Sequence, residues 1–229
     1  MSALRLDLAK MSVRELNNFL HHGLAAERTE AVEILNPNGM HNLAVGVDWP
    51  GRIDIRGHAG YFIGGMNKQA DIVVHGNVGW SVGENIMSGT IRVRGNASEC
   101  TGASGHGGLI VVEGDCSSRC GISMKGCEIV VGGSVGHVSG FMAQAGTIVV
   151  CGDAGAGLGD SIYETVIYVR GKIHSLGADA REEAMQDSDY KTVERLLARA
   201  GMEHNSREFK RVASARTLYH WNVEAGQEY

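Results

Sequence analysis

The sequence lacks several features that would place it in common functional classes. It has no recognisable secretion signal and no apolar run long enough to span a bilayer, so we expect a cytoplasmic protein with no membrane association. Its formal net charge is −5 and its basic residues are not clustered, which argues against nucleic acid as a partner. Its five cysteines, an odd number, fit a reducing compartment better than a disulfide framework.

Arrangements of side chains that are typical of catalysis are also missing. The chain begins Met1-Ser2 and so offers no N-terminal cysteine, and no serine or cysteine lies in a nucleophile elbow. The ten histidines are scattered, without a pair at metal-ligand spacing and a convincing third ligand. We therefore expect this chain to supply no catalytic residue and to bind no metal or cofactor of its own.

What the sequence does have is a repeat of constant length. Between residues 53 and 171 an apolar–x–apolar–x–glycine pattern occurs seven times, and successive repeats are 19 residues apart. Its first position is always isoleucine and its last always glycine: Ile53, Ile72, Ile91, Ile110, Ile129, Ile148 and Ile167, with Gly57, Gly76, Gly95, Gly114, Gly133, Gly152 and Gly171. A fixed period without insertions indicates that each repeat is one coil stacked on the last.

The length of the repeat selects the type of coil. Nineteen residues are too few for a strand, a crossover helix and its loops, so the repeats must be coils of a parallel β-solenoid. Two further columns carry small and medium residues that suit a narrow interior. They are Ala59, Val78, Ala97, Cys116, Val135, Ala154 and Ile173, and Ile63, Val82, Thr101, Cys120, Ser139 and Leu158.

A second glycine column marks the bends, at Gly64, Gly83, Gly102, Gly121, Gly140 and Gly159. We expect glycine there because the backbone turns with positive φ or packs against the next coil where a Cβ would clash. Gly76, Gly79 and Gly83 could be mistaken for a phosphate-binding loop, but no long amphipathic helix follows them. The recurrence of these glycines favours a structural role.

The flanking segments are expected to cap the solenoid. Ser12 to Glu15 form a capping box, so residues 12–26 are predicted to be a helix, and residues 31–50 resemble a degenerate first coil. After the repeats, an apolar stripe ending at Gly201 predicts another helix, residues 205–216 are a further helix candidate, and an irregular tail follows. The predicted organisation is therefore a capping segment over 1–50, a β-helix over 51–178 and a helical tail over 179–229.

One outward column is unexpectedly apolar: Val111, Val130 and Val149 lie between the two inward columns of their strands. A strand face exposed to water would be polar there, so something must cover this valine wall. Two alternatives remain open at this stage, namely the terminal helices of the chain itself and a partner subunit. We carry all three valines forward as candidate partner contacts.

Polar candidates occur on the bends. Glu84, His106 and Arg119 lie on successive coils, where they either line a groove that contacts partners or are simply solvated turns. The spacing of Cys116, Cys120 and Cys127 could suggest an iron–sulfur site. The first two, however, occupy inward columns, so buried thiols are the better interpretation.

Four stretches carry a resemblance to a known family: Arg14-Glu15-Leu16-Asn17, residues 83–89 (GENIMSG), residues 119–126 (RCGISMKG) and Leu176-Gly177-Ala178-Asp179. With the repeated G-x-x-G-x-x-x-G, they resemble the glutamate synthase carboxy-terminal (GXGXG) domain family. The chain is most similar to the stand-alone form of that domain, the β-helix subunit of N-methylglutamate synthase and its relatives. The resemblance covers nearly the whole chain.

The resemblance implies a right-handed β-helix and a hetero-oligomeric enzyme. Its partners would be a glutamine-amidotransferase-like subunit and an FMN-binding subunit with an iron–sulfur cluster, which together transfer ammonia or methylamine. This chain would be a scaffold that holds the two active subunits in place. No catalytic residue is carried over.

Three alternatives remain. The same superfamily includes the β-helical C subunit of formylmethanofuran dehydrogenase and of the formyltransferase/hydrolase complex. A hexapeptide acyltransferase would have an 18-residue coil and usually a catalytic histidine, which the 19-residue period opposes. The third alternative is an assembly protein without an enzyme partner. The neighbouring genes would distinguish these possibilities.

Overall fold

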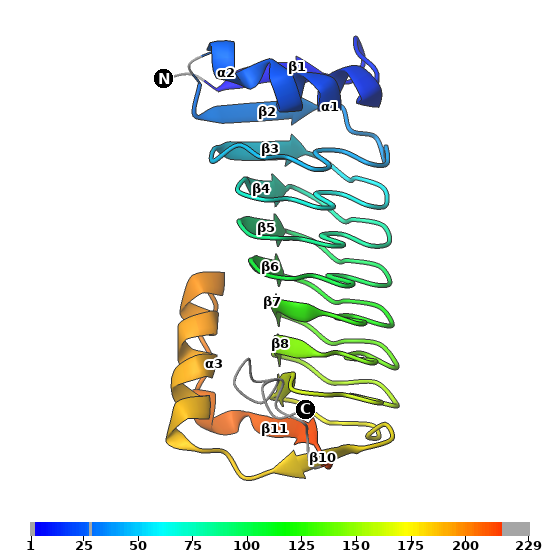
Figure 1. The fold of residues 1–229 in the computed structure, drawn as a ribbon, viewed down its shortest axis with the longest axis vertical. Coiled ribbons are helices and arrows are strands. Elements are labelled where there is room, and N and C mark those ends of the chain that lie inside the picture. Colours follow the sequence, from blue (N-terminus) through cyan, green and yellow to red (C-terminus); the bar gives the residue numbers. More distant parts are fainter. Residues whose placement is uncertain (1–2, 28, 217–229) are drawn as a thin grey trace, which may run out of the picture.

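The computed structural model describes residues 3–27 and 29–216, which form a rod of stacked coils (Figure 1). Strands β1 to β9 pair in parallel in chain order, and β11 joins β9 to β10 with antiparallel pairing. The strands are β1 (Leu4–Asp7), β2 (Ala31–Leu35), β3 (Arg52–Arg56), β4 (Asp71–Val74), β5 (Thr90–Val93), β6 (Leu109–Val112), β7 (Lys125–Val131), β8 (Ala145–Val150), β9 (Val166–Val169), β10 (Ala180–Glu183) and β11 (Lys210–Ser214).

The predicted columns are in register along the rod. Ile53 pairs with Ile72, and each later isoleucine of the column pairs with the next as far as Ile167. The column from Ala59 to Ile173 is joined by parallel bridges, and the column from Ile63 to Leu158 is at most 1% exposed. The predicted fold class is therefore confirmed: the chain is an all-β, right-handed parallel β-helix of about seven coils.

A ladder of polar side chains runs along the rod just after the strands. Each side chain accepts a hydrogen bond from the backbone N–H of its counterpart in the next coil; Asn96 Oδ1, for example, is 2.9 Å from the nitrogen of Asp115. The acceptor ladder consists of His58, Asn77, Asn96, Asp115, Ser134 and Asp153. A Cβ at Gly114 would lie only 2.1 Å from that Asn96 oxygen. Close packing, rather than positive φ, therefore requires glycine at this position.

The bends have left-handed backbone at three alternate positions in each coil. The predicted glycine column supplies the middle one, with φ of 63° at Gly64 and 73° at Gly140. Most of the flanking ones are non-glycine residues, among them Phe62 at 60° and Val138 at 55°, and Gly157 at 73° is an exception. Only the glycine column was predicted, because the flanking columns contain no common residue type.

The N-terminal cap follows the prediction in part. Helix α1 (Val13–His22) begins at the predicted capping box, in which Ser12 Oγ accepts from the nitrogen of Glu15 at 3.2 Å. The helix is interrupted at Gly23, and the short helix α2 (Leu24–Glu27) follows, so two helices replace the single helix that was predicted. Residues 31–35 pair with β3 as the expected degenerate coil, whereas β1 was not predicted.

The C-terminal cap is less helical than predicted. Helix α3 (Asp187–Ala200) ends at Gly201, whose left-handed φ of 67° confirms the predicted stop. The second predicted helix, over residues 205–216, is wrong: a 3-10 turn, η1 (Ser206–Glu208), leads into β11. Val212 pairs with Ile167, so β11 covers the open edge of the last coil, where an unpaired strand would otherwise remain. The predicted irregular tail lies outside the described residues.

Among the residues that the structure describes, no helix is long and apolar enough to cross a membrane.

Candidate functional site

The valine wall is covered by the chain itself. Val111, Val130 and Val149 are all 0% exposed and form a second core with apolar residues of α3, namely Val193, Leu196, Leu197 and Ala200. Figure 1 shows α3 lying alongside the C-terminal half of the rod. A partner subunit cannot reach these valines while α3 lies there. Our prediction that they contact a partner is therefore corrected: the other alternative applies, in which a terminal helix of the chain itself covers them.

Polar contacts fix α3 at both ends. Near its start, the Tyr168 hydroxyl donates to Asp189 at 2.6 Å. Burial is the larger cause that raises the pKa of Tyr168, and the hydrogen bond with the Asp189 carboxylate is the second. At its end, Arg92 Nη1 donates to the carbonyl oxygen of Ala200 at 2.8 Å. Such a cation at a helix C-terminus satisfies a free carbonyl and the helix dipole. Helix α3 is therefore fixed to the strands of the rod by apolar packing and by these polar contacts.

The three bend candidates are only partly brought together. Glu84 and Arg119 both act on the half-buried Cys100, together with Glu99; burial, and then the charge of Glu99, raise the pKa of this thiol. Arg119 lies 3.9 Å from Glu99, a long and weak ion pair. His106 is exposed beyond the bend, and among the described residues no interaction joins it to Glu84 or Arg119.

These bends form one continuous surface, which we call the turn edge: residues 61–66, 80–85, 99–104, 118–123, 137–142 and 156–161. Backbone hydrogen bonds stack these segments in register; the nitrogen of Ser81, for example, donates to the oxygen of Glu99 at 2.8 Å. The charged residues of the turn edge are only Glu84, Glu99, Arg119 and Asp160. A surface of this length with so few charges is unusual in a chain of which 21% is charged.

The turn edge also gathers the exposed apolar side chains. Among the described residues the exposed large apolar side chains are Tyr61, Met66, Trp80, Met87 and Met142, and all but Met87 belong to the turn edge. Trp80 is the most exposed, at 61%. Exposed tryptophan, tyrosine and methionine with few charges are the composition of a protein interface. These aromatic residues were not predicted, although Tyr61 and Trp80 each follow a glycine and lie 19 residues apart.

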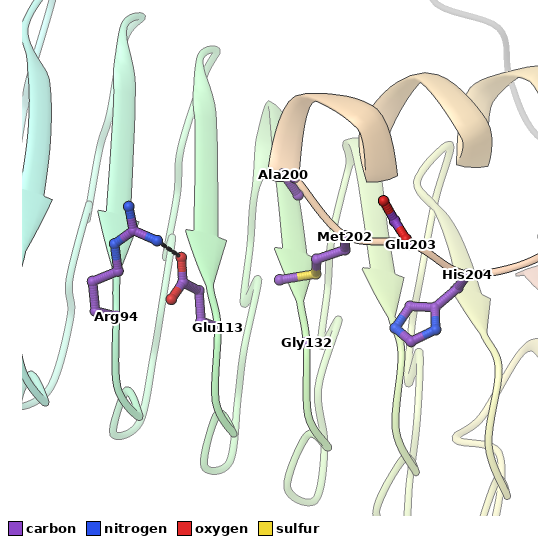
Figure 2. A pocket seen from close by; sticks show the side chains of 8 residues that line it. Arg94, Glu113, Gly132, Ala200, Met202, Glu203 and His204 are labelled. Carbon is purple, nitrogen blue, oxygen red and sulfur yellow. Dashed lines mark hydrogen bonds and ion pairs between the residues drawn. The ribbon is translucent and has the colours of Figure 1, made fainter.

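An open hollow of about 400 Å³ lies where α3 ends above β5 to β7 (Figure 2). It is lined by Arg94, Glu113, Gly132, Ala200, Gly201, Met202, Glu203 and His204. Three of its polar side chains are engaged: Arg94 pairs with Glu113 at 2.5 Å, and Arg170 donates to His204 Nδ1 at 2.7 Å. These contacts explain the hollow as the junction between the helix end and the sheet.

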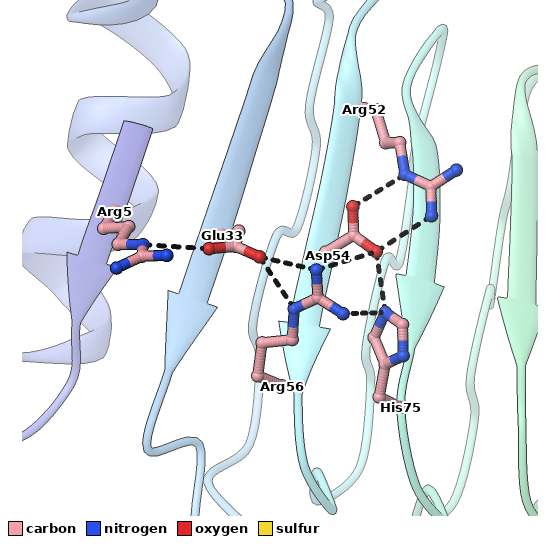
Figure 3. A network of polar contacts seen from close by, with 6 residues as sticks. All are labelled: Arg5, Glu33, Arg52, Asp54, Arg56 and His75. Carbon is pink, nitrogen blue, oxygen red and sulfur yellow. Dashed lines mark hydrogen bonds and ion pairs between the residues drawn. The ribbon is translucent and has the colours of Figure 1, made fainter. Parts of the chain in front are cut away.

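A chain of alternating charges crosses the outer face of β1 to β4 (Figure 3). Glu33 accepts from Arg5 at 3.0 Å and from Arg56, while Asp54 accepts from Arg52 at 2.6 Å and contacts His75 Nε2 at 2.6 Å. The hydrogen bond from Arg52 is the main cause that lowers the pKa of Asp54 to about 2, and His75 adds to it. The N-terminal coils fill this face with an ion-pair network, whereas the coils from β6 onward fill it with valine packed against α3, with Glu128 pairing with Arg195 and Arg199 of that helix.

The three thiols that suggested an iron–sulfur site are core residues. Cys116 is 4% exposed, and Cys120 and Cys127 are 0% exposed. The contact with Cys116 and then burial raise the pKa of Cys120, and burial raises that of Cys127 to about 12. Iron is bound by thiolates, which this apolar interior disfavours. Among residues 3–27 and 29–216, no group of three metal-ligating side chains is placed to hold an ion.

Comparison with known proteins gives one full-length relative and no family model. The chain is 49% identical over 225 residues to protein GlxC of Rhizobium meliloti (strain 1021), and the match covers 98% of this chain and 99% of that protein. No model of a protein family matches the sequence. Identity at this level over the full length of both chains is enough to assign the family, and we conclude that the chain belongs to the family of GlxC.

Proposed function

We propose that this chain is the structural subunit of a glutamate-synthase-like enzyme of the N-methylglutamate synthase type. It would hold a glutamine-amidotransferase-like subunit against a subunit that carries FMN and an iron–sulfur cluster. The observation that carries the proposal is the turn edge, an apolar and weakly charged surface along a rod whose coils keep one register. The motif resemblance described above supplies the identity of the partners.

The physical reason for such a subunit lies in the reaction. Ammonia or methylamine released at one active site is lost to solvent unless the second site stays in a fixed position. A rod of stacked coils with paired backbone groups and a ladder of side-chain acceptors resists bending better than a loop would. The polar residues of the acceptor ladder contribute to that rigidity, because each one joins two successive coils.

The test is co-expression of the tagged chain with the two proposed partner subunits. We expect a complex of all three in size-exclusion chromatography with light scattering, with the FMN absorbance in the same peak. Product analysis with methylamine and with ammonia identifies the amine. Co-purification with an amidohydrolase-like and a formyltransferase subunit instead would favour the one-carbon complex, and a chain that remains alone would refute the proposal.

Substitutions on the turn edge test whether this surface makes the assembly. Met66→Asp and Met142→Asp place a charge on side chains that are 44% and 52% exposed, and aspartate tolerates the left-handed backbone at both positions. We expect each variant to fold normally by circular dichroism and to lose the complex. Ala198→Asp, on the exposed face of α3, is the matched control that should assemble as the wild type does.

A further inference from the structure

Three aromatic side chains of successive coils, His41, Tyr61 and Trp80, lie at the N-terminal end of the turn edge. The rings of His41 and Tyr61 stack with centroids 3.6 Å apart and an angle of 17° between their planes. The nitrogen of Phe62 donates to the oxygen of Trp80 at 2.8 Å, which fixes Trp80 in the coil that follows Tyr61. Tyr61 and Trp80 are 47% and 61% exposed, so the Tyr61 face away from His41 and the Trp80 side chain are accessible to a ligand.

These rings border a hollow. It has a volume of about 470 Å³, opens to solvent and is lined by Asn42, Tyr61, Phe62, Trp80 and Ser81. Asn42 and Ser81 add polar groups to a lining that is otherwise aromatic. The hollow is continuous with the rest of the turn edge, because Phe62 and Ser81 also begin the left-handed bends of their coils.

Two carboxylates, Glu84 and Glu99, lie on the turn edge in the coil of Trp80 and in the next coil, and the cation Arg119 lies close to them. Glu99 occupies the place of Trp80 in the next coil, where its backbone oxygen accepts from Ser81 at 2.8 Å. Its carboxylate is 36% exposed and its ion pair with Arg119, at 3.9 Å, is too long to hold it firmly. Glu84 adds a second carboxylate in the coil of Trp80, and both act on the thiol of Cys100. The turn edge therefore carries exposed aromatic side chains one coil away from a part-exposed carboxylate that is only weakly paired with Arg119.

We propose that this aromatic end binds an arginine side chain of a partner subunit, a proposal that rests on the assembly proposed above. Tyr61 and Trp80 would stack on the planar guanidinium, and Glu99 would accept its N–H groups. An aromatic face beside a carboxylate suits arginine better than lysine, since only guanidinium both stacks and donates in a planar fork. The continuous apolar edge on the same side indicates a protein surface rather than a free small molecule.

The first experiment measures the affinity of the complete complex with Trp80→Leu and Glu99→Gln. We expect Trp80→Leu to weaken assembly roughly thirtyfold, as a central interface aromatic does. Glu99→Gln should weaken it about fivefold to tenfold and reduce its dependence on salt. Glu182→Gln, an exposed carboxylate on β10, is the control. Unchanged affinity in both variants would overturn the arginine site and leave the proposed function standing.

A second experiment identifies the occupant. Tyr61→p-benzoylphenylalanine in the complex, followed by irradiation and mass spectrometry, should cross-link to a partner peptide that contains arginine. Cross-linking to a second copy of this chain, or to a peptide without arginine, contradicts the proposal.

A third experiment needs no partner. The full chain is titrated with N-acetyl-argininamide while the indole N–H of Trp80 is followed by NMR. We expect a saturable shift that the lysine analogue does not produce and that Glu99→Gln reduces. If the shift is saturable but the co-expressed subunits form no complex, the proposed function is refuted, and what stands is an arginine site without the proposed partner. Equal effects of the two analogues would refute the arginine site.

Discussion

The glycine that closes each strand shows how one residue type can be required for a reason that is not conformational. At Gly114 the backbone is ordinary, but the side-chain oxygen of Asn96 lies where a Cβ would be. The repeat of glycines could be recognised in the sequence, and close packing was one of the two reasons expected. The acceptors were not recognised, because histidine, asparagine, aspartate and serine share no obvious pattern beyond an atom that accepts a hydrogen bond.

This packing gives a prediction. Gly114→Ala should push Asn96 out of the acceptor ladder and leave the N–H of Asp115 without its bond, at a cost of about 2 kcal/mol of unfolding free energy. Urea denaturation measures it. In an Asn96→Ala background the same change should cost much less, because the Cβ then has room. Additive effects in this double-mutant cycle would contradict the proposed cause.

At the scale of elements, the strands of the coils were predictable from columns and the caps only in part. The isoleucine and alanine columns repeat often enough to identify seven coils, and the stripe ending at Gly201 identified α3. Strand β11 was predicted as a helix because its sequence, with Arg211 and Val212, has no partner column; its pairing with β9 is decided by the open end of the rod. The turn edge was half predicted: Glu84 and Arg119 were named, whereas Trp80 was not.

The cover of the valine wall gives a prediction for α3. Leu196 is 0% exposed against this wall, so Leu196→Asp should detach the helix, increase hydrogen exchange throughout α3 and cost about 3–5 kcal/mol in a two-state measurement. The core amides of β3 to β5 should exchange as before. Ala198→Asp, on the opposite face, should cost only about 1 kcal/mol, from the lower helix propensity of aspartate and its negative charge in the last turn. Equal protection of α3 in both variants would show that the helix does not depend on the wall.

The charged network across β1 to β4 predicts a dependence on pH. The pKa of Asp54 is lowered from 3.8 to about 2 in the folded chain, so its ionised form contributes stability above pH 3.8, and the contribution is lost as the pH falls to about 2. The contribution is at most about 2 kcal/mol. Asp54→Asn should therefore be less stable at pH 7 and lose less stability between pH 4 and 2 than the wild type, as measured by urea unfolding. Glu182→Gln should keep the wild-type slope, and parallel curves for Asp54→Asn would contradict the prediction.

For the whole molecule, the constant period means that a coil is a unit of length. Insertion of a second copy of residues 58–76 after Gly76 should give a folded rod longer by about 4.8 Å. If the rod sets the distance between two active subunits, glutamine-dependent activity should fall while activity with added ammonia or methylamine persists. An insertion of ten residues at the same point breaks the register and is the control that should unfold. Full glutamine-dependent activity of the longer rod would show that distance is not what the subunit supplies.

The acceptor ladder has a direction and an end. Every rung accepts a hydrogen bond from the coil that follows, and the last acceptor, Asp153 Oδ1, accepts one from the nitrogen of Lys172 at 2.7 Å. Lysine has no atom to offer a further coil. Growth of the stack is therefore terminated by chemistry at this residue as well as by the strand that folds over it, which protects a repetitive, edge-exposing polypeptide from end-to-end polymerisation into fibres.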